Sequence, residues 1–280
     1  MSSYSGYGFR QFKKHNRTMI NFICFGTDNC ENSLRIFYDH LINSCKERFV
    51  LHYYSINYES SVFGDNLIIH PFNINFNFGR ANFYKPYVLL KSMMDIPEND
   101  FVYLDLDIVI TKHFSSEELL QKIDSSPTPL SPNHFWEHPY KIINGIETQN
   151  AENLSKFYNV NIFNKYVQNC VIIYNKEHFN FMLDWSVLTS NKETLEMVYG
   201  DEEIYNFLLW KYEQPNTLGY LCITSGTETT GEFSDSESIL KSYQKFEKGE
   251  FDKTSFIVNN NFVKNLELDK VMFFHGLKYL

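Results

Sequence analysis

Apolar runs and segments of helical period alternate through the first 110 residues of the chain. Apolar residues recur every three to four positions over residues 33–45, which is typical of an amphipathic helix. A second helix is expected over 81–94 and starts near Pro86, since proline is tolerated in a first helical turn. Strands that alternate with such helices indicate an open, mostly parallel α/β sheet. The runs that predict buried strands cover residues 19–25, 49–56, 67–71 and 101–110.

The remainder of the chain adds an apolar strand over 167–174 and a helix over 201–212. Residues 225–238 are small, polar and acidic with no apolar period, so we expect a surface excursion there. No internal repeat or linker interrupts the pattern. We therefore expect a polar N-terminal lead over residues 1–18 and a single α/β domain over 19–280.

Composition narrows the class of protein. The 280 residues include 25 Lys and Arg against 34 Asp and Glu, a formal net charge of -9. Nucleic acids and anionic membranes attract concentrated basic side chains, so neither is an expected partner. The five cysteines form no C-x-x-C pair, no run reaches the roughly 18 apolar residues of a membrane span, and the polar lead lacks the apolar core of a signal peptide. A reduced, cytoplasmic enzyme is expected, and surface apolar patches could support a homodimer.

Two aspartates interrupt the apolar strand predicted over 101–110. Burying the ionised Asp105 and Asp107 carboxylates is costly unless a partner neutralises them. Side chains at positions i and i+2 of a strand share a face, so both can converge on one cation, and Mg²⁺ or Mn²⁺ prefers oxygen ligands. The alternative is that both aspartates cap the strand end and bond to loop amides. A carboxylate-bound cation in an acidic protein suggests an anionic ligand such as a diphosphate.

The motifs around these aspartates resemble those of GT-A nucleotide-sugar glycosyltransferases. They are most similar to family 8 retaining enzymes of the glycogenin and lipooligosaccharide galactosyltransferase type, in which an aromatic-basic helix start precedes an Asp-x-Asp strand. The resemblance spans about residues 19–278 and implies a GT-A fold, a Rossmann-like mixed sheet flanked by helices. The motifs that carry it, in the family's order, are Asn-Phe-Tyr-Lys at 82–85, Asp-Leu-Asp at 105–107, the strand at 167–175, Asp-Glu-Glu-Ile-Tyr-Asn at 201–206 and a shortened His-Gly-Leu-Lys at 275–278.

The resemblance also implies roles for individual residues. Asp105, Asp107 and His275 would hold the cation that bridges the donor diphosphate. Each position has an ordinary structural explanation as well, such as a solvated lysine at 85 or a buried histidine at 275. The residues implied in donor binding are Phe25, Thr27 and Asp28 at the base and ribose, Arg80, Lys85 and Lys278 as cations, and Leu106 between the two aspartates.

The implied catalytic residues are Asp201, Glu202, Gln168 and Asn169. Asp201 would contact sugar hydroxyls, and Glu202 would face the anomeric centre or the acceptor hydroxyl. As a general base, Glu202 would support inversion. In a retaining enzyme, Gln168, Asn169 or Glu202 would lie on the other face of the sugar. Glu202 and Gln168 or Asn169 stand where the family carries Gln and Asn, and the resemblance as a whole favours retention.

The sequence thus predicts a metal-dependent hexosyltransferase that uses Mn²⁺ or Mg²⁺, a nucleotide-diphosphate sugar (UDP-linked sugars being favoured) and a glycan or other hydroxyl acceptor. One alternative is a sugar nucleotidyltransferase, but the turn after the first strand lacks the basic residue that its phosphate loop needs. Another is a degenerate sugar-nucleotide or glycan-binding protein. An H-x-x-E-H pattern at 134–138 resembles a zinc site, but Pro139 disfavours the required helix. We expect that aromatic loop to be an acceptor-binding flap or a packed loop.

Overall fold

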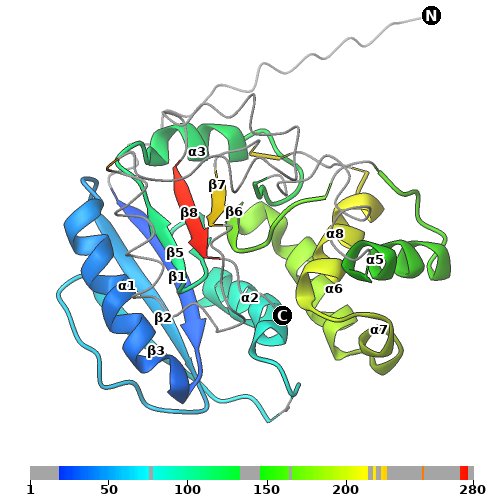
Figure 1. Ribbon diagram of the computed structural model, residues 1–280, viewed down its shortest axis with the longest axis horizontal. Coiled ribbons are helices and arrows are strands. Elements are labelled where there is room, and N and C mark those ends of the chain that lie inside the picture. The colour runs from blue at the N-terminus through cyan, green and yellow to red at the C-terminus, as the bar shows by residue number, and fades with distance from the viewer. Residues whose placement is uncertain are drawn as a thin grey trace, which may run out of the picture.

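A five-stranded sheet in the order β3-β2-β1-β4-β6 forms the centre of the molecule (Figure 1). The computed structural model describes residues 19–75, 78–132, 146–163, 166–213, 217–218, 222–225, 248 and 272–276. The first four strands in this order are parallel, and β6 pairs with β4 in the antiparallel direction. Their bounds are β1 Ile20–Gly26, β2 Phe49–Ile56, β3 Leu67–Phe72, β4 Asp100–Leu104 and β6 Val171–Asn175.

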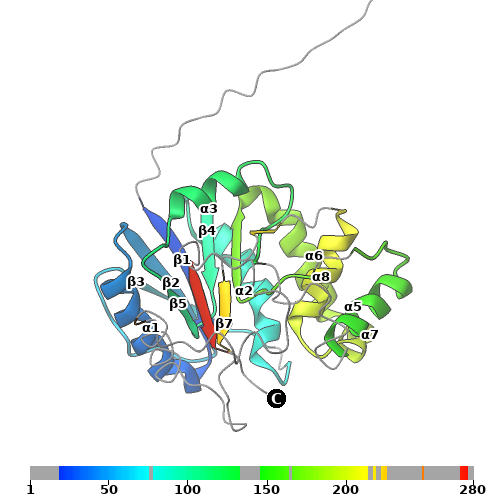
Figure 2. The ribbon, with the colours of Figure 1, turned by 45° about the horizontal axis from the view of Figure 1, so that its top comes forward.

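Helices cover both faces of this sheet. In Figures 1 and 2, α5 to α8 gather on one side of the molecule, away from α1. The α-helices are α1 Glu31–Ser44, α2 Lys85–Asp95, α3 Ser116–Ile123, α5 Ile146–Phe157, α6 Phe179–Ser190, α7 Lys192–Met197 and α8 Asp201–Lys211. Short 3-10 helices are η1 Asp28–Cys30, η2 Ala81–Tyr84 and η3 Lys176–His178.

Alternation along the strands divides the core in two. Phe22 and Cys24 of β1 belong to one buried cluster, together with Leu34 of α1. Ile23, between them, belongs to the other cluster, together with Val88 of α2. Successive side chains of a strand point to opposite faces, and both faces of this sheet are covered by helices. Near-continuous apolar runs were therefore the correct signal for these strands.

The segment 101–110 forms two strands, whereas the sequence predicted one. The structure ends β4 at Leu104 and starts β5 (Ile108–Ile110) after a turn. β5 belongs to a second sheet in the order β5-β8-β7, with β7 at Cys222–Ser225 and β8 at Phe273–Gly276. The turn closes when the Ile108 N–H donates to the Asp105 carbonyl at 3.0 Å. Asp105 and Asp107 therefore lie in this turn, outside the hydrogen-bonded strands.

The other predicted elements are present with shifted bounds. The helix expected over 81–94 begins as 3-10 helix and becomes α-helical at Lys85, and the strand expected over 167–174 begins at Val171. The expected N-terminal lead, the aromatic loop at 134–138 and residues 226–238 lie outside the described residues. Within the described part of the chain, no helix has the length and apolar character needed to cross a bilayer.

Candidate functional site

The Asp-Leu-Asp turn lies at the carboxyl end of β4. The Asp105 N–H donates to the Cys170 carbonyl at 2.9 Å, which ties the turn to the segment before β6. The Asp105 side chain is partly exposed, Leu106 is half-buried, and Asp107 is 9% exposed. In an open α/β sheet, the carboxyl ends of the strands form the usual ligand crevice.

Lys85, the first residue of α2, is the centre of a buried polar cluster next to this turn. Its Nζ lies 3.2 Å from Asp105 Oδ1 and 3.4 Å from Asp201 Oδ2, and its side chain is only 3% exposed. The same ammonium donates to the Asn169 carbonyl at 3.1 Å and to Asn169 Oδ1 at 3.2 Å. Burial opposes the charged amine, but the Asp105 and Asp201 carboxylates outweigh it and raise the pKa of Lys85. Lys85 thus remains a cation that holds two carboxylates together.

Asp201, the first residue of α8, is held by two amide side chains. Asn82 Nδ2 donates to Asp201 Oδ1 at 2.8 Å, and Asn169 Nδ2 donates to Asp201 Oδ2 at 2.6 Å. Its carboxyl is 3% exposed, and this burial raises its pKa, although the Lys85 cation acts in the opposite direction. A carboxylate in the first turn of a helix is also favoured by the helix dipole. The acceptor lone pairs of Asp201 therefore have a fixed orientation.

Two further predicted residues border the same cluster. Glu202 is half-exposed, and its Oε2 accepts a 3.3 Å hydrogen bond from the Asn169 N–H. Gln168 is buried, and its N–H donates to the Pro132 carbonyl at 3.0 Å. The Glu202 side chain is thus more accessible to a ligand than that of Gln168.

Tyr103 connects the cluster to the end of β1. Its hydroxyl donates to Asp105 Oδ1, and the Lys85 Nζ lies 5.1 Å from the centre of its ring. The ring of Phe25 stacks on Tyr103, with centroids 6.1 Å apart. Phe25 therefore adjoins the candidate site through packing.

Thr27 and Asp28 follow β1 in an exposed turn with local hydrogen bonds. The Thr27 hydroxyl donates to Asn29 Oδ1 at 2.5 Å, and Asp28 Oδ1 accepts from the Asn29 N–H at 2.9 Å. Neither bond reaches the Lys85 cluster. Their predicted contact with a base and ribose stays a prediction.

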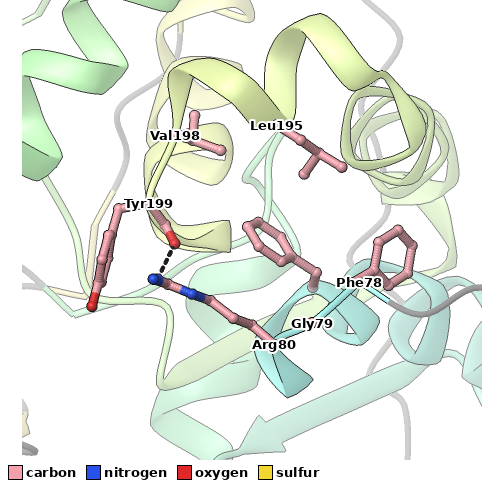
Figure 3. Close-up of a pocket in the computed structure, with 7 residues that line it drawn as sticks. Phe78, Gly79, Arg80, Leu195, Val198 and Tyr199 are labelled. Carbon is pink, nitrogen blue, oxygen red and sulfur yellow. Dashed lines mark hydrogen bonds between the residues drawn. The ribbon is translucent and has the colours of Figure 1, made fainter.

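Arg80 lines a pocket beside the polar cluster (Figure 3). The same two segments of the chain contribute to the pocket and to the cluster. Its Nη1 donates to the Tyr199 carbonyl, and its guanidinium carbon lies 3.7 Å from the centre of the Tyr199 ring. The pocket has a volume of about 300 Å³. Two residues further along each segment, Asn82 and Asp201 form the hydrogen bond described above. The pocket and the cluster are therefore neighbours.

The chemistry of the donor set decides whether a divalent cation fits here. Asp105 and Asp107 offer carboxylate oxygens on one turn, the ligand type that Mg²⁺ and Mn²⁺ prefer. Within the described ranges, no group of three His, Cys, Asp or Glu side chains is arranged to hold a metal ion. The backbone of His275 pairs with Ile108, the residue after Asp107, whereas Lys278 lies outside the described residues. The two aspartates thus fit a cation that takes its other ligands from elsewhere, as Mg²⁺ does when it binds substrate phosphates.

Three residues of this site, Asn82, Tyr103 and Glu203, have no role predicted from the sequence. Asn82 and Tyr103 bind Asp201 and Asp105, as described above. Glu203 is 1% exposed, and its carboxylate accepts from the Tyr199 N–H at 2.9 Å and the Gly200 N–H at 2.7 Å. Burial raises the pKa of Glu203 to about 7. A glutamate three residues after a helix N-cap is a known capping signal, so the sequence could have revealed Glu203.

Comparison with solved structures supports the fold. No family model and no curated protein matches the sequence. Among solved structures, the galactosyltransferase LgtC in complex with donor and acceptor sugar analogs matches with a TM-score of 0.55 and 11% identity, over 92% of this chain and 87% of that chain. An active-site mutant of LgtC gives a TM-score of 0.54, at 12% identity and the same coverage. The bifunctional glycosyltransferase WbbM in its apo form gives 0.53 at 12% identity, over 92% of this chain and 45% of that one.

The chain therefore has the mixed α/β fold of these glycosyltransferases, which confirms the fold class expected from the sequence. TM-scores of 0.55 and 0.53 at 11% and 12% identity establish a shared fold alone, so the chemistry must be argued from the site itself.

Proposed function

We propose that the chain is a glycosyltransferase that moves a sugar from a nucleotide-diphosphate donor to a hydroxyl acceptor. The observation that carries the proposal is the cluster of Lys85, Asp105, Asn169 and Asp201 at the carboxyl end of β4. These residues come from four separate motifs between positions 82 and 206, and one ammonium contacts the other three. A purely structural ion pair would not require the partly exposed Asp105 or an adjacent Asp107.

In this proposal the charges are arranged for a sugar diphosphate. A Mn²⁺ or Mg²⁺ ion held by Asp105 and Asp107 would neutralise the charge that develops on the leaving diphosphate. Lys85 keeps the Asp105 and Asp201 carboxylates fixed. Asp201 accepts hydrogen bonds from hydroxyls of the donor sugar, and its orientation is preset by Asn82 and Asn169. UDP-linked sugars are the donors we favour, on the family resemblance.

The proposed reaction proceeds with retention. The bond between the anomeric carbon and the phosphate oxygen breaks, and the electron pair leaves with the nucleoside diphosphate. The acceptor oxygen bonds to the anomeric carbon on the same face, and its proton passes to the departing phosphate oxygen. Glu202, half-exposed and hydrogen-bonded to the Asn169 N–H, would lie near the anomeric centre and stabilise the positive charge that develops on the sugar ring.

The test incubates the chain and Mn²⁺ with a panel of UDP-, GDP- and CMP-sugars and measures turnover as release of the nucleotide. We expect slow donor hydrolysis with one nucleotide class, and faster release when an acceptor sugar is added. NMR of the transferred product should show the anomeric configuration of the donor. Release of pyrophosphate from a nucleoside triphosphate and a sugar phosphate would instead identify a nucleotidyltransferase. No turnover of any donor would contradict the proposal.

A matched pair of variants separates the cluster from general stability. Asp105→Asn should abolish nucleotide release, because it removes a ligand of the cation and a partner of Lys85. Asp184→Asn, in a surface ion pair with Lys211 at 2.6 Å, should leave nucleotide release unchanged. Equal activity of the two variants would remove Asp105 from the chemistry.

A further inference from the structure

A pocket of about 300 Å³ opens between the start of η2 and the segment that joins α7 to α8 (Figure 3). Phe78, Phe83, Leu195 and Val198 contribute apolar side chains to its lining, and Gly79, Arg80 and Tyr199 contribute the rest. Pockets for small molecules usually measure about 300–1,000 Å³. This pocket therefore has room for one ring system and not for an oligosaccharide.

The position of the pocket links it to the candidate site. Residues 80–82 and 199–201 lie side by side and make two successive contacts. Arg80 bonds to the Tyr199 carbonyl at the pocket, and Asn82 bonds to Asp201 at 2.8 Å in the polar cluster. The pocket therefore adjoins the place proposed for the donor sugar, which is the side from which an acceptor can approach that sugar.

The chemistry of the walls indicates the kind of substituent. A sugar ring needs several hydrogen-bond partners when it is buried, whereas four of the lining side chains are hydrocarbon. Gly79 has a backbone φ of +72°, and a Cβ built on it would meet no atom within 4 Å, so the backbone leaves open space at this edge. The guanidinium of Arg80 is stacked on the Tyr199 ring, which presents a flat cationic surface suited to an aromatic ring.

We propose that this pocket binds the aglycone of the acceptor, and that the acceptor is a glycoside or alcohol with an aromatic or other flat apolar ring. The inference rests on the proposed function, because an acceptor presupposes sugar transfer. The polar cluster would then hold the donor sugar, and the pocket would select the acceptor. Leu195 and Val198 are the specificity-determining residues in this assignment.

The test measures binding without donor or cation, so it does not depend on catalysis. Phenyl β-D-glucopyranoside and methyl β-D-glucopyranoside are titrated into the full chain and followed by ligand-observed NMR. We expect the phenyl compound to bind about 10-fold more tightly or better, from burial of one ring. Equal binding of the two compounds would overturn the assignment.

Substitutions that fill the pocket test whether the preference for the phenyl compound arises there. Leu195→Trp fills the space and should reduce the phenyl preference to about onefold. Val198→Phe is a second filling variant if the first does not fold. Leu183→Trp is the matched control, because Leu183 is 40% exposed on α6 and outside the pocket. A phenyl preference that survives in both filling variants would contradict the proposal.

Competition distinguishes an acceptor pocket from a donor pocket. Uridine and UMP should leave the bound phenyl glucoside in place, because the resemblance puts the base and ribose at the end of β1, which adjoins the cluster through Phe25 and Tyr103. Displacement by uridine would assign the pocket to the donor base and overturn the acceptor assignment. Phenyl-selective binding in a chain that turns over no nucleotide sugar would retain the pocket as a site for aromatic rings and refute the transferase function together with the acceptor role.

Discussion

Two groups of buried or partly buried titratable side chains differ in how their pKa values respond to burial. In the first, Lys85 contacts Asp105 and Asp201, and these carboxylates raise the pKa of the lysine despite its burial. In the second, His52 Nδ1 and His70 Nε2 lie 3.0 Å apart, and burial lowers the pKa of His52 to about 4. The first group remains charged and the second remains neutral.

The difference lies in what surrounds each group. The His70 ring stacks on Tyr54 with centroids 4.6 Å apart, and Asp95 and Lys91 of α2 are the charged groups that act on it, in opposite directions. No net charge compensates protonation of the pair. The Lys85 cluster, by contrast, brings acidic side chains to a sheet end where ligands are expected. Charge is thus retained at the candidate site, whereas the stacked neutral rings lie on β2 and the edge strand β3.

The largest expected effect comes from removing the cation of the first group. Lys85→Met should lower the free energy of unfolding by about 3–5 kcal/mol, because two carboxylates lose their buried partner. Urea denaturation measures the change. Lys122→Met is the control, since Lys122 pairs with Glu118 on the surface of α3 and such a pair contributes about 0.3–0.5 kcal/mol. Equal stability of the two variants would show that Lys85 does not hold the carboxylates.

The next effect concerns activity, which is measured separately from stability because Asp201 is also a buried partner of Lys85. Asp201→Asn should reduce nucleotide release about 100-fold, or about 2.7 kcal/mol in transition-state stabilisation, because the amide replaces a fixed acceptor of sugar hydroxyls. Steady-state assays on the best donor measure it, and the melting temperature reports folding. Undiminished release by a folded Asp201→Asn variant would remove Asp201 from the site.

The histidine pair should make stability depend on pH. The pKa of His52 is lower in the folded chain than its ordinary value of 6.5, so the unfolded chain binds more protons. Stability from this group is complete above about pH 6.5 and is lost as the pH falls toward about 4. Thermal melts of the wild type and His52→Gln between these values test it. The melting temperatures should converge as the pH falls, and a constant difference would contradict the expectation.

An effect of opposite sign is expected from Glu203. Burial raises its pKa to about 7, so the folded chain binds the extra proton and stability from this group is lost as the pH rises from about 4.5 to about 7. Glu203→Gln has no carboxyl to ionise. Its stability relative to the wild type should therefore improve over that range, measured by urea denaturation at each pH. A relative stability that falls with rising pH would show the sign to be wrong.

The sequence predicted the elements more completely than their connections. Strands β1 and β2 and helix α8 follow from apolar runs and periodicity, and their predicted bounds are within two residues of the observed ones. The break after Leu104 was missed, because every residue around the two aspartates is apolar and nothing local marks a turn. The closing bond from Ile108 to Asp105 is visible only in three dimensions.

The candidate site was predicted as residues and not as contacts. Lys85, Asp105, Asn169 and Asp201 were chosen from separate motifs, and the structure brings them together. Burial of Lys85 beneath its partners could not be foreseen, because it depends on how α2 and α8 pack. The histidine pair likewise depends on the register of two parallel strands, which places His70 opposite Tyr54 and diagonal to His52.

The most direct test of the central claim is a thermal-shift titration of the full chain with nucleotide sugars, with and without Mn²⁺. We expect one nucleotide class to raise the melting temperature by several degrees at about 100 times its dissociation constant, only with the cation present. The shift should disappear in Asp107→Ala. A chain that no nucleotide sugar stabilises in the presence of Mn²⁺ would contradict the assignment of this site to a nucleotide-sugar donor.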